Sequence, residues 1–250
     1  MSNINELLLM TGGDIAFTAA RNIIHQPRIF EIAMIGERAF QIGSRFINVN
    51  KNILTQQDKV ELGDIDNFDI FMSVMSNPEK NEYKTDSFLV LSLLFPNSII
   101  QIEKEKILIK VENSENISSI NRDNFKEFQS IISKIFCLGE SKGQNGYDPA
   151  DIYAKKIAEK IQKGKVKKAK EEKEKEENSS EINLFSRYIS ILSIGLQKSK
   201  NELSQYTVYQ ITDEFERYRR KISYDIYIDA KMAGASDLEE VKNWMEDIHS

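Results

Sequence analysis

The chain has little of the residue types that usually build catalytic or metal centres. A single cysteine, Cys137, stands among 250 residues, which excludes an intrachain disulfide and a cysteine-rich zinc site. No apolar run is long enough to span a bilayer, and the first residues lack the basic stretch and the apolar core of a signal peptide. We therefore expect a cytoplasmic protein without a membrane segment.

Nucleotide-binding and hydrolase motifs are also missing. The turn Thr11-Gly12-Gly13-Asp14 lacks the lysine and the following serine or threonine of a phosphate loop, and no serine lies in a nucleophile elbow. The net charge of −5 gives no general attraction for nucleic acid. An enzyme is the least favoured class, and we expect no cofactor and no metal.

The few residues that could carry chemistry have structural interpretations that we favour. His249 is the penultimate residue, and His25 has no histidine or cysteine at ligand spacing. Cys137 follows isoleucine and phenylalanine and resembles a small buried hydrophobic residue. Asp225 and Asp229 would share a helix face, where a metal or an acid–base pair is conceivable, but the basic residues just upstream offer ordinary ion pairs.

The first half of the chain mixes helical and strand patterns. Residues 5–10 fit a short strand or a helical turn, and residues 15–24 permit a strand. Helical spacing follows over 29–40, 55–62 and 68–75, with Thr55 and Asn67 as caps, and residues 86–95 read as a buried core element. Alternating isoleucines in 98–112 predict a hairpin that turns at residues 103–106, with a possible third strand near Ile117 and then a helix over 121–138.

A charged region separates this half from a helical tail. Residues 139–146 are rich in glycine and read as a flexible joint, and Asp148-Pro149 starts a helix. Residues 163–177 are almost all lysine and glutamate, which is typical of a solvated helix or tether. The lysines between Lys163 and Lys170 are the best argument for a nucleic-acid arm. The acidic residues that follow at once, and the absence of interleaved aromatics, favour the tether.

The tail carries the strongest periodicity in the chain. Six residues recur every three or four positions and predict one apolar stripe along a long helix: Val208, Ile211, Phe215, Tyr218, Ile222 and Ile226. An earlier helix is expected around 180–192. We expect Gly234 to end the long helix in a left-handed conformation, and Ser236 with Glu239 to cap a short final helix.

These patterns predict an α+β chain. The expected parts are an N-terminal α/β domain with a small antiparallel hairpin sheet (residues 1–138), a flexible joint and charged helical linker (139–179) and an all-α domain (180–250). The apolar face of the tail exceeds what its short helices can cover. We therefore predict that it binds a partner through aromatic and apolar side chains, namely Tyr224, Tyr227, Trp244 and Met245.

The tail also resembles a known class of proteins. The residues concerned are the segment from Leu184 to Leu192, the segment from Tyr209 to Phe215, and the end with Ala233-Gly234 and Trp244-Met245. The chain resembles tail-morphogenesis proteins of tailed phages that infect Gram-positive bacteria, most nearly the tail assembly chaperones. This resemblance implies a protein without an active site that coats the tape-measure protein until tail-tube subunits replace it.

Three functions from different classes remain open at this point. The leading one is a non-enzymatic tail assembly factor in the host cytoplasm, bound to the tape-measure or tail-tube protein. The second is a minor tail or baseplate subunit retained in the virion tail, for which the large N-terminal part is better suited. The third is a nucleic-acid-binding factor that uses the lysines from Lys163 to Lys170. Homo-oligomerisation is compatible with each.

Overall fold

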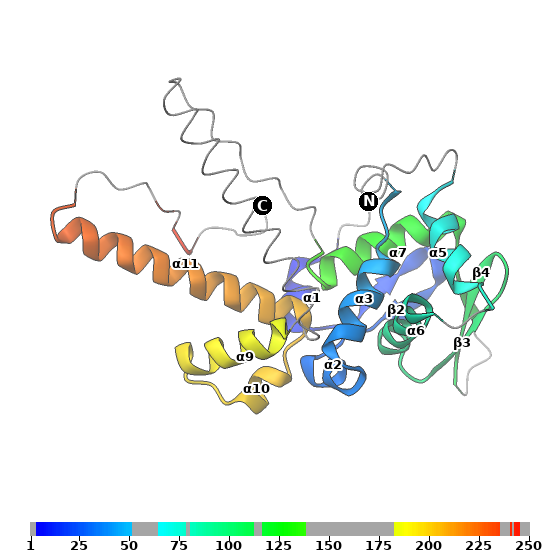
Figure 1. Ribbon diagram of the computed structural model, residues 1–250, viewed down its shortest axis with the longest axis horizontal. Coiled ribbons are helices and arrows are strands. Elements are labelled where there is room, and N and C mark those ends of the chain that lie inside the picture. Colours follow the sequence, from blue (N-terminus) through cyan, green and yellow to red (C-terminus); the bar gives the residue numbers. More distant parts are fainter. Residues whose placement is uncertain are drawn as a thin grey trace, which may run out of the picture. The chain divides into compact units, whose positions relative to one another are not determined.

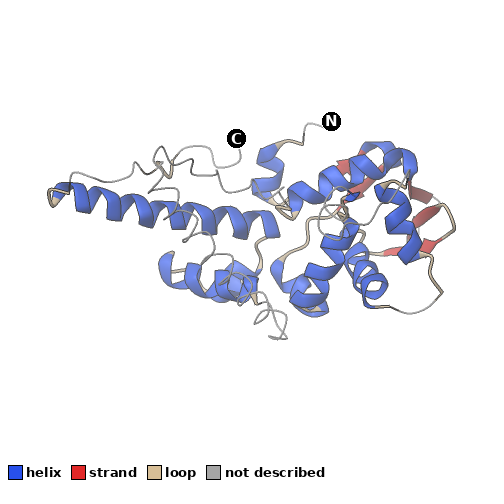
Figure 2. Cartoon of the chain, turned by 45° about the horizontal axis from the view of Figure 1, so that its top comes forward, coloured by secondary structure: helices blue, strands red, loops and turns tan. Residues whose placement is uncertain are grey.

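The computed structural model describes residues 4–51, 65–78, 81–112, 117–138, 183–235, 241 and 243–245. Among them it shows a mixed α+β fold, with N-terminal helices, two small antiparallel sheets and a helical C-terminal region (Figures 1 and 2). The predicted fold class is thus confirmed. Residues 1–138 and 184–250 group into one compact unit and residues 139–183 into a second. The predicted domain boundaries stay predictions.

A helix and a hairpin begin the chain. The helix α1 (Glu6–Thr11) is capped by Asn5 and ends at Gly12, whose φ of 69° is left-handed. The strands β1 (Ile15–Phe17) and β2 (Asn22–Ile24) then pair antiparallel around the 3-10 helix η1 (Thr18–Ala20). The single strand permitted by the sequence over residues 15–24 is therefore two.

Five described helices and a three-stranded sheet follow in the N-terminal part. The first four helices are α2 (Ile29–Ile35), α3 (Glu37–Ile47), α5 (Asn67–Met75) and α6 (Glu82–Leu94). The predicted hairpin is confirmed as β3 (Ser98–Ile102) and β4 (Lys106–Val111), and β5 (Ile117–Asn121) adds the third strand in the order β3-β4-β5. The predicted helix that follows is α7 (Arg122–Ile135), capped by Asn121.

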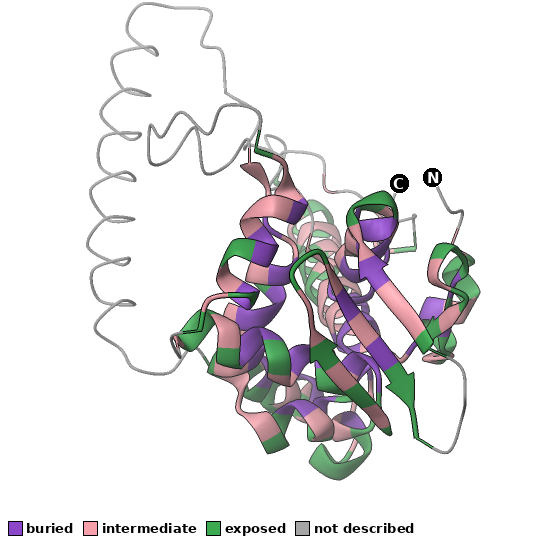
Figure 3. Ribbon diagram, turned by 90° about the vertical axis from the view of Figure 1, so that its right-hand side faces the viewer, coloured by how far each residue is buried: buried purple, intermediate pink, exposed green. Residues whose placement is uncertain are grey.

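A phenylalanine-rich core joins these elements. The inner face of the sheet supplies Ile107, Ile109 and Ile120, all fully buried, and α7 packs its own apolar face beside them. The ring of Phe71 on α5 stacks on Phe125 of α7, with ring centroids 5.2 Å apart. Half-buried and buried residues alternate along the first four residues of β4, and half-buried and exposed residues alternate along β3 (Figure 3), as expected for a sheet with one face on the core.

In the described residues of the C-terminal region, the chain forms three helices: α9 (Leu184–Gly195), α10 (Lys200–Ser204) and α11 (Val208–Met232). The predicted long helix and the helix before it are confirmed. The chain leaves α11 through Gly234 at a φ of 94°, as the sequence predicted. The short helix α10 was not predicted. It begins with a capping box between Ser199 and Glu202, a signal that is present in the sequence.

Several local predictions need correction. The single helix predicted over residues 29–40 is two, because Gly36 takes φ 90° and ψ 136°, which no helix accommodates. The N-cap of α5 is Asp66, which accepts from the Asp69 N–H, and Asn67 is instead the first helical residue. Cys137 lies just beyond α7 at a φ of 52° and not inside a helix.

Some predicted elements lie outside the described residues. These are the helix at 55–62, the joint and charged segment at 139–179 with Lys163 and Lys170, and the cap at Ser236 and Glu239. Of the predicted final helix only Val241 and residues 243–245 are described, and Trp244 and Met245 lie there in a turn.

Candidate interaction surface

The first turns of α11 are anchored in the N-terminal part. Val208, Tyr209 and Ile211 are buried, and the Tyr209 hydroxyl donates to Glu6 on α1 at 3.3 Å. The Gln210 side chain donates to the carbonyl of Met10 at 2.7 Å. Just before the helix, the carbonyl of Tyr206 accepts from the N–H of Ile29 at 2.9 Å. These bonds fix the start of α11 against α1 and α2.

The next two turns of α11 are covered by α9. The Tyr188 ring stacks on Phe215 with centroids 3.9 Å apart and an interplanar angle of 13°. One turn further on, Gly195 lies so close to Tyr218 that an added Cβ would come within 2.2 Å of the tyrosine ring. A side chain at position 195 would push the end of the Tyr218 ring aside. The end of α9 therefore fits against Tyr218 because residue 195 is glycine.

The apolar stripe of α11 continues beyond the end of α9. Ile222 and Ile226 prolong the line of Val208, Ile211, Phe215 and Tyr218, yet 40% of Ile222 and 63% of Ile226 are exposed. Figures 1 and 2 show α11 extending past α9. We name Ile222 and Ile226 the distal stripe. The same periodicity is thus buried by the chain's own helices in its first half and uncovered among the described residues in its second half.

Charged residues on α11 pair with one another. Arg217 binds Asp213 at 3.0 Å, Glu216 accepts from Arg219 at 2.8 Å and from Arg220 at 3.2 Å, and Lys221 binds Asp225 at 2.6 Å. The basic cluster is therefore matched by acids of the same helix, which weakens it as a phosphate-binding surface. The ion-pair interpretation of Asp225 agrees with these contacts.

Acidic side chains border the distal stripe. Asp225 lies three residues after Ile222 and Asp229 three residues after Ile226, so each carboxylate lies beside one isoleucine of the stripe on the helix surface. Among residues 183–235, no ion pair involves Asp229. The exposed surface thus combines isoleucines with carboxylates.

The four predicted contact residues are only partly exposed. Tyr224 and Tyr227 lie off the stripe, with ring centroids 6.5 Å apart, and Lys231 places its ammonium 5.3 Å from the Tyr227 ring centroid. Both tyrosines and Trp244 are half-buried, whereas 67% of Met245 is exposed. Their role in binding stays a prediction. The distal stripe was part of the predicted apolar line, but the sequence did not show which half of that line would remain uncovered.

The predicted titratable residues have structural partners. His25 lies between Asp14, 2.9 Å from its Nδ1, and Glu31, 3.2 Å from its Nε2. Glu31 also accepts from the N–H of Arg28 at 2.7 Å and so caps α2. Burial raises the pKa of the Cys137 thiol to about 11, which leaves it protonated and unreactive at neutral pH. His249 lies outside the described residues.

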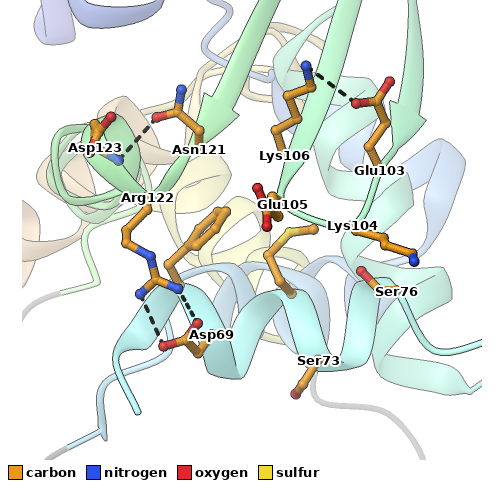
Figure 4. Close-up of a pocket in the computed structure, with 12 residues that line it drawn as sticks. Asp69, Ser73, Ser76, Glu103, Lys104, Glu105, Lys106, Asn121, Arg122 and Asp123 are labelled. Carbon is orange, nitrogen blue, oxygen red and sulfur yellow. Dashed lines mark hydrogen bonds and ion pairs between the residues drawn. The ribbon is translucent and has the colours of Figure 1, made fainter. Parts of the chain in front are cut away.

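A surface hollow of about 1020 Å³ lies between α5 and the β3–β4 turn (Figure 4). Its charged residues come from the turn, namely Glu103, Lys104, Glu105 and Lys106, and from α5 and α7. Arg122 at the start of α7 binds both Asp66 and Asp69. This hydrogen bonding, first from the Arg122 side chain, lowers the pKa of Asp69 to about 2. The hollow thus holds a capping network that joins α5 to α7.

The described residues contain neither a candidate metal cluster nor a helix that could cross a membrane. No group of three or more histidine, cysteine, aspartate or glutamate residues there is arranged to hold a metal ion. No helix in the described part of the chain is both long and apolar enough to cross a membrane.

One comparison with known families relates to the C-terminal region. Residues 172–249 match the family model of the YomV second domain, a domain of an SPbeta prophage protein. The match covers α9, α10 and α11, and therefore both the buried and the exposed halves of the stripe. No curated protein and no solved structure matches the chain. The domain match indicates a prophage-related protein.

Proposed function

We propose that the chain is a non-enzymatic phage tail assembly factor that binds another tail protein through the distal stripe of α11. The observation that supports this proposal is a stripe whose first half packs against the chain's own helices and whose second half is uncovered among the described residues. The YomV-domain match over the same helices supports a phage context. A chaperone-type role in the host cytoplasm, with the tape-measure protein as first candidate partner, extends the resemblance of the tail to assembly chaperones.

The chemistry of the surface defines the partner segment. Isoleucines spaced four apart on a helix fit the apolar face of a second helix, which is a common mode of recognition. Asp229, which forms no ion pair among residues 183–235, favours a segment that places lysine or arginine beside its apolar residues. We expect the bound helix to lie along residues 221–232, beyond the reach of α9.

Truncating the distal stripe should weaken binding strongly without unfolding the protein. The exposed fractions of 40% and 63% amount to about one isoleucine side chain, whose burial is worth roughly 2–3 kcal/mol. The double substitution Ile222→Ser and Ile226→Ser should therefore lower affinity about 30- to 150-fold. The buried remainder of the two side chains also amounts to about one isoleucine, so the double variant should lose up to roughly 2–3 kcal/mol of stability and still fold.

The experiment is affinity capture by the full chain of separately purified tape-measure and tail-tube proteins from the same prophage. Met34→Ser is the matched control, because 84% of Met34 is exposed but it lies on α2, outside the stripe. We expect capture by the wild type and by the control, and loss with the double variant. Equal capture by all three proteins would place the site elsewhere. Failure of the wild type to retain either partner, combined with its presence in purified particles, would favour a structural tail subunit.

A further inference from the structure

The strand β3 forms one edge of the three-stranded sheet. Among the described residues it pairs with β4 on one side only, in the register Ser98↔Val111 to Ile102↔Ile107. The flanking bonds from the Glu103 N–H to the Lys106 carbonyl and from the Glu112 N–H to the Asn97 carbonyl are both 2.9 Å long. These two bonds show that Asn97 and Glu103 direct their backbone groups toward β4.

This register leaves three residues of β3 with backbone groups that face away from the sheet. In an antiparallel ladder, bonded and non-bonded residue pairs alternate. Because Asn97 and Glu103 bond toward β4, the N–H and C=O groups of Ser98, Ile100 and Ile102 must point to the free edge. Among the described residues, no hydrogen bond reaches these outward groups.

The edge at β3 also lacks the features that usually block pairing. It contains neither a charged residue nor a proline, both of which protect natural edge strands. Ile100 and Ile102 belong to the inner face but remain half-buried, whereas their partners Ile109 and Ile107 are fully buried. The inner face is therefore incompletely covered at β3, and a further strand would complete it.

The opposite edge of the sheet, at β5, is in contact with other residues of the chain. There the side chain of Asn22 donates to the Ser118 hydroxyl of β5 at 2.6 Å, and η1 lies against the same strand. The β5 edge is thus partly occupied by the chain's own residues, which makes β3 the better site for an added strand.

We propose that a second copy of this chain pairs its own β3 with this edge, antiparallel and with Ile100 opposite Ile100. Ser98 then faces Ile102 of the other copy, and each outward N–H and C=O acquires a partner. Residues directly opposite one another in such a pair share a face. The inner faces of the two copies are therefore continuous, and the half-buried isoleucines meet across the axis.

The sequence of β3 favours a second copy over a different chain. The segment Ser98-Ile99-Ile100-Gln101-Ile102 presents no charge, so pairing with itself brings no like charges together. The nearest carboxylate, Glu103, would lie opposite the neutral Asn97 of the other copy. The pairing at β3 is independent of the proposed tail-protein site.

Sedimentation equilibrium of the full chain tests this proposal. We expect a dimer that forms between about 10 µM and 1 mM, since an edge contact is small. Ile100→Lys should weaken it at least about tenfold, because two ammonium groups would face each other across the axis. In the monomer, that half-exposed side chain can extend into water. Ile117→Lys is the control, since it places the same charge on the β5 edge, where 61% of Ile117 is exposed.

Hydrogen exchange of the wild-type protein provides a second test of the β3 pairing and needs no variant. The amides of Ser98, Ile100 and Ile102 should exchange more slowly as the wild-type concentration rises. A wild type that stays monomeric at about 1 mM would overturn the proposal. So would a dimer in which these amides exchange unchanged. Protection that requires an added tail protein would assign the edge to a foreign strand instead.

Discussion

Replacing Gly43 by alanine should force α3 and α6 apart. A Cβ at position 43 would lie 2.4 Å from the carbonyl oxygen of Asp86 and 2.8 Å from a methyl group of Val90. Ordinary contact begins near 3.4 Å, so the helices must separate by roughly 1 Å. The atom in the way belongs to the backbone of a packed helix, and no side-chain rotation can relieve the contact.

The expected loss of stability follows from two opposing effects. Alanine gains about 1 kcal/mol over glycine in a helix, whereas overpacking a tight contact costs typically about 1–3 kcal/mol or more. Because backbone must move, we expect the upper end of this range and a net loss of about 2 kcal/mol. For a chain of this size the Tm should fall by roughly 4–8 °C. Thermal unfolding, monitored by circular dichroism, measures this fall in Tm.

The matched comparison is Gly195→Ala. Its Cβ would meet Tyr218, a half-exposed side chain that can swing aside, so the loss should be under about 1 kcal/mol. A Gly43→Ala variant that is as stable as the wild type, or more stable, would refute the close approach of α3 to Asp86.

Two further predictions concern titratable groups. Arg122→Ala should raise the pKa of Asp69 from about 2 toward its ordinary value of 3.8, as measured by NMR titration. Because the folded pKa is lowered, the stabilising effect is complete above 3.8 and is lost as the pH falls to about 2, where wild type and variant should converge. Asp86→Asn should stabilise the protein at neutral pH, since burial and then the charge of Glu82 raise the pKa of this carboxyl. Urea unfolding should show that this gain shrinks as the pH falls through the raised pKa toward 3.8; a variant less stable than the wild type at every pH would contradict it.

The sequence predicted those parts of the fold where local pattern and tertiary packing agree. The alternating isoleucines of β3 and β4 and the spacing of residues on α11 each have one face to bury, so their periodicity is visible without coordinates. The break between α2 and α3 at Gly36 could not be predicted from the sequence. Glycine is tolerated within helices, and only the observed φ of 90° shows that the chain turns there.

The candidate surfaces depend on tertiary packing that no local pattern contains. The sequence contains the whole apolar stripe of α11, but which half remains uncovered depends on where α9 ends, at Gly195 beside Tyr218. The open edge at β3 depends on strand order and register. The contact between Gly43 and Asp86 joins helices that are separated in the sequence, and neither residue indicates it alone.

The proposed binding site can be tested most directly by hydrogen exchange of the full chain with and without the tape-measure protein of the same prophage. Binding along the distal stripe predicts slower exchange across residues 221–232, with the anchored start of α11 unchanged because it is already packed. Complex formation without any change in residues 221–232, or with protection confined to the N-terminal elements, would contradict the account.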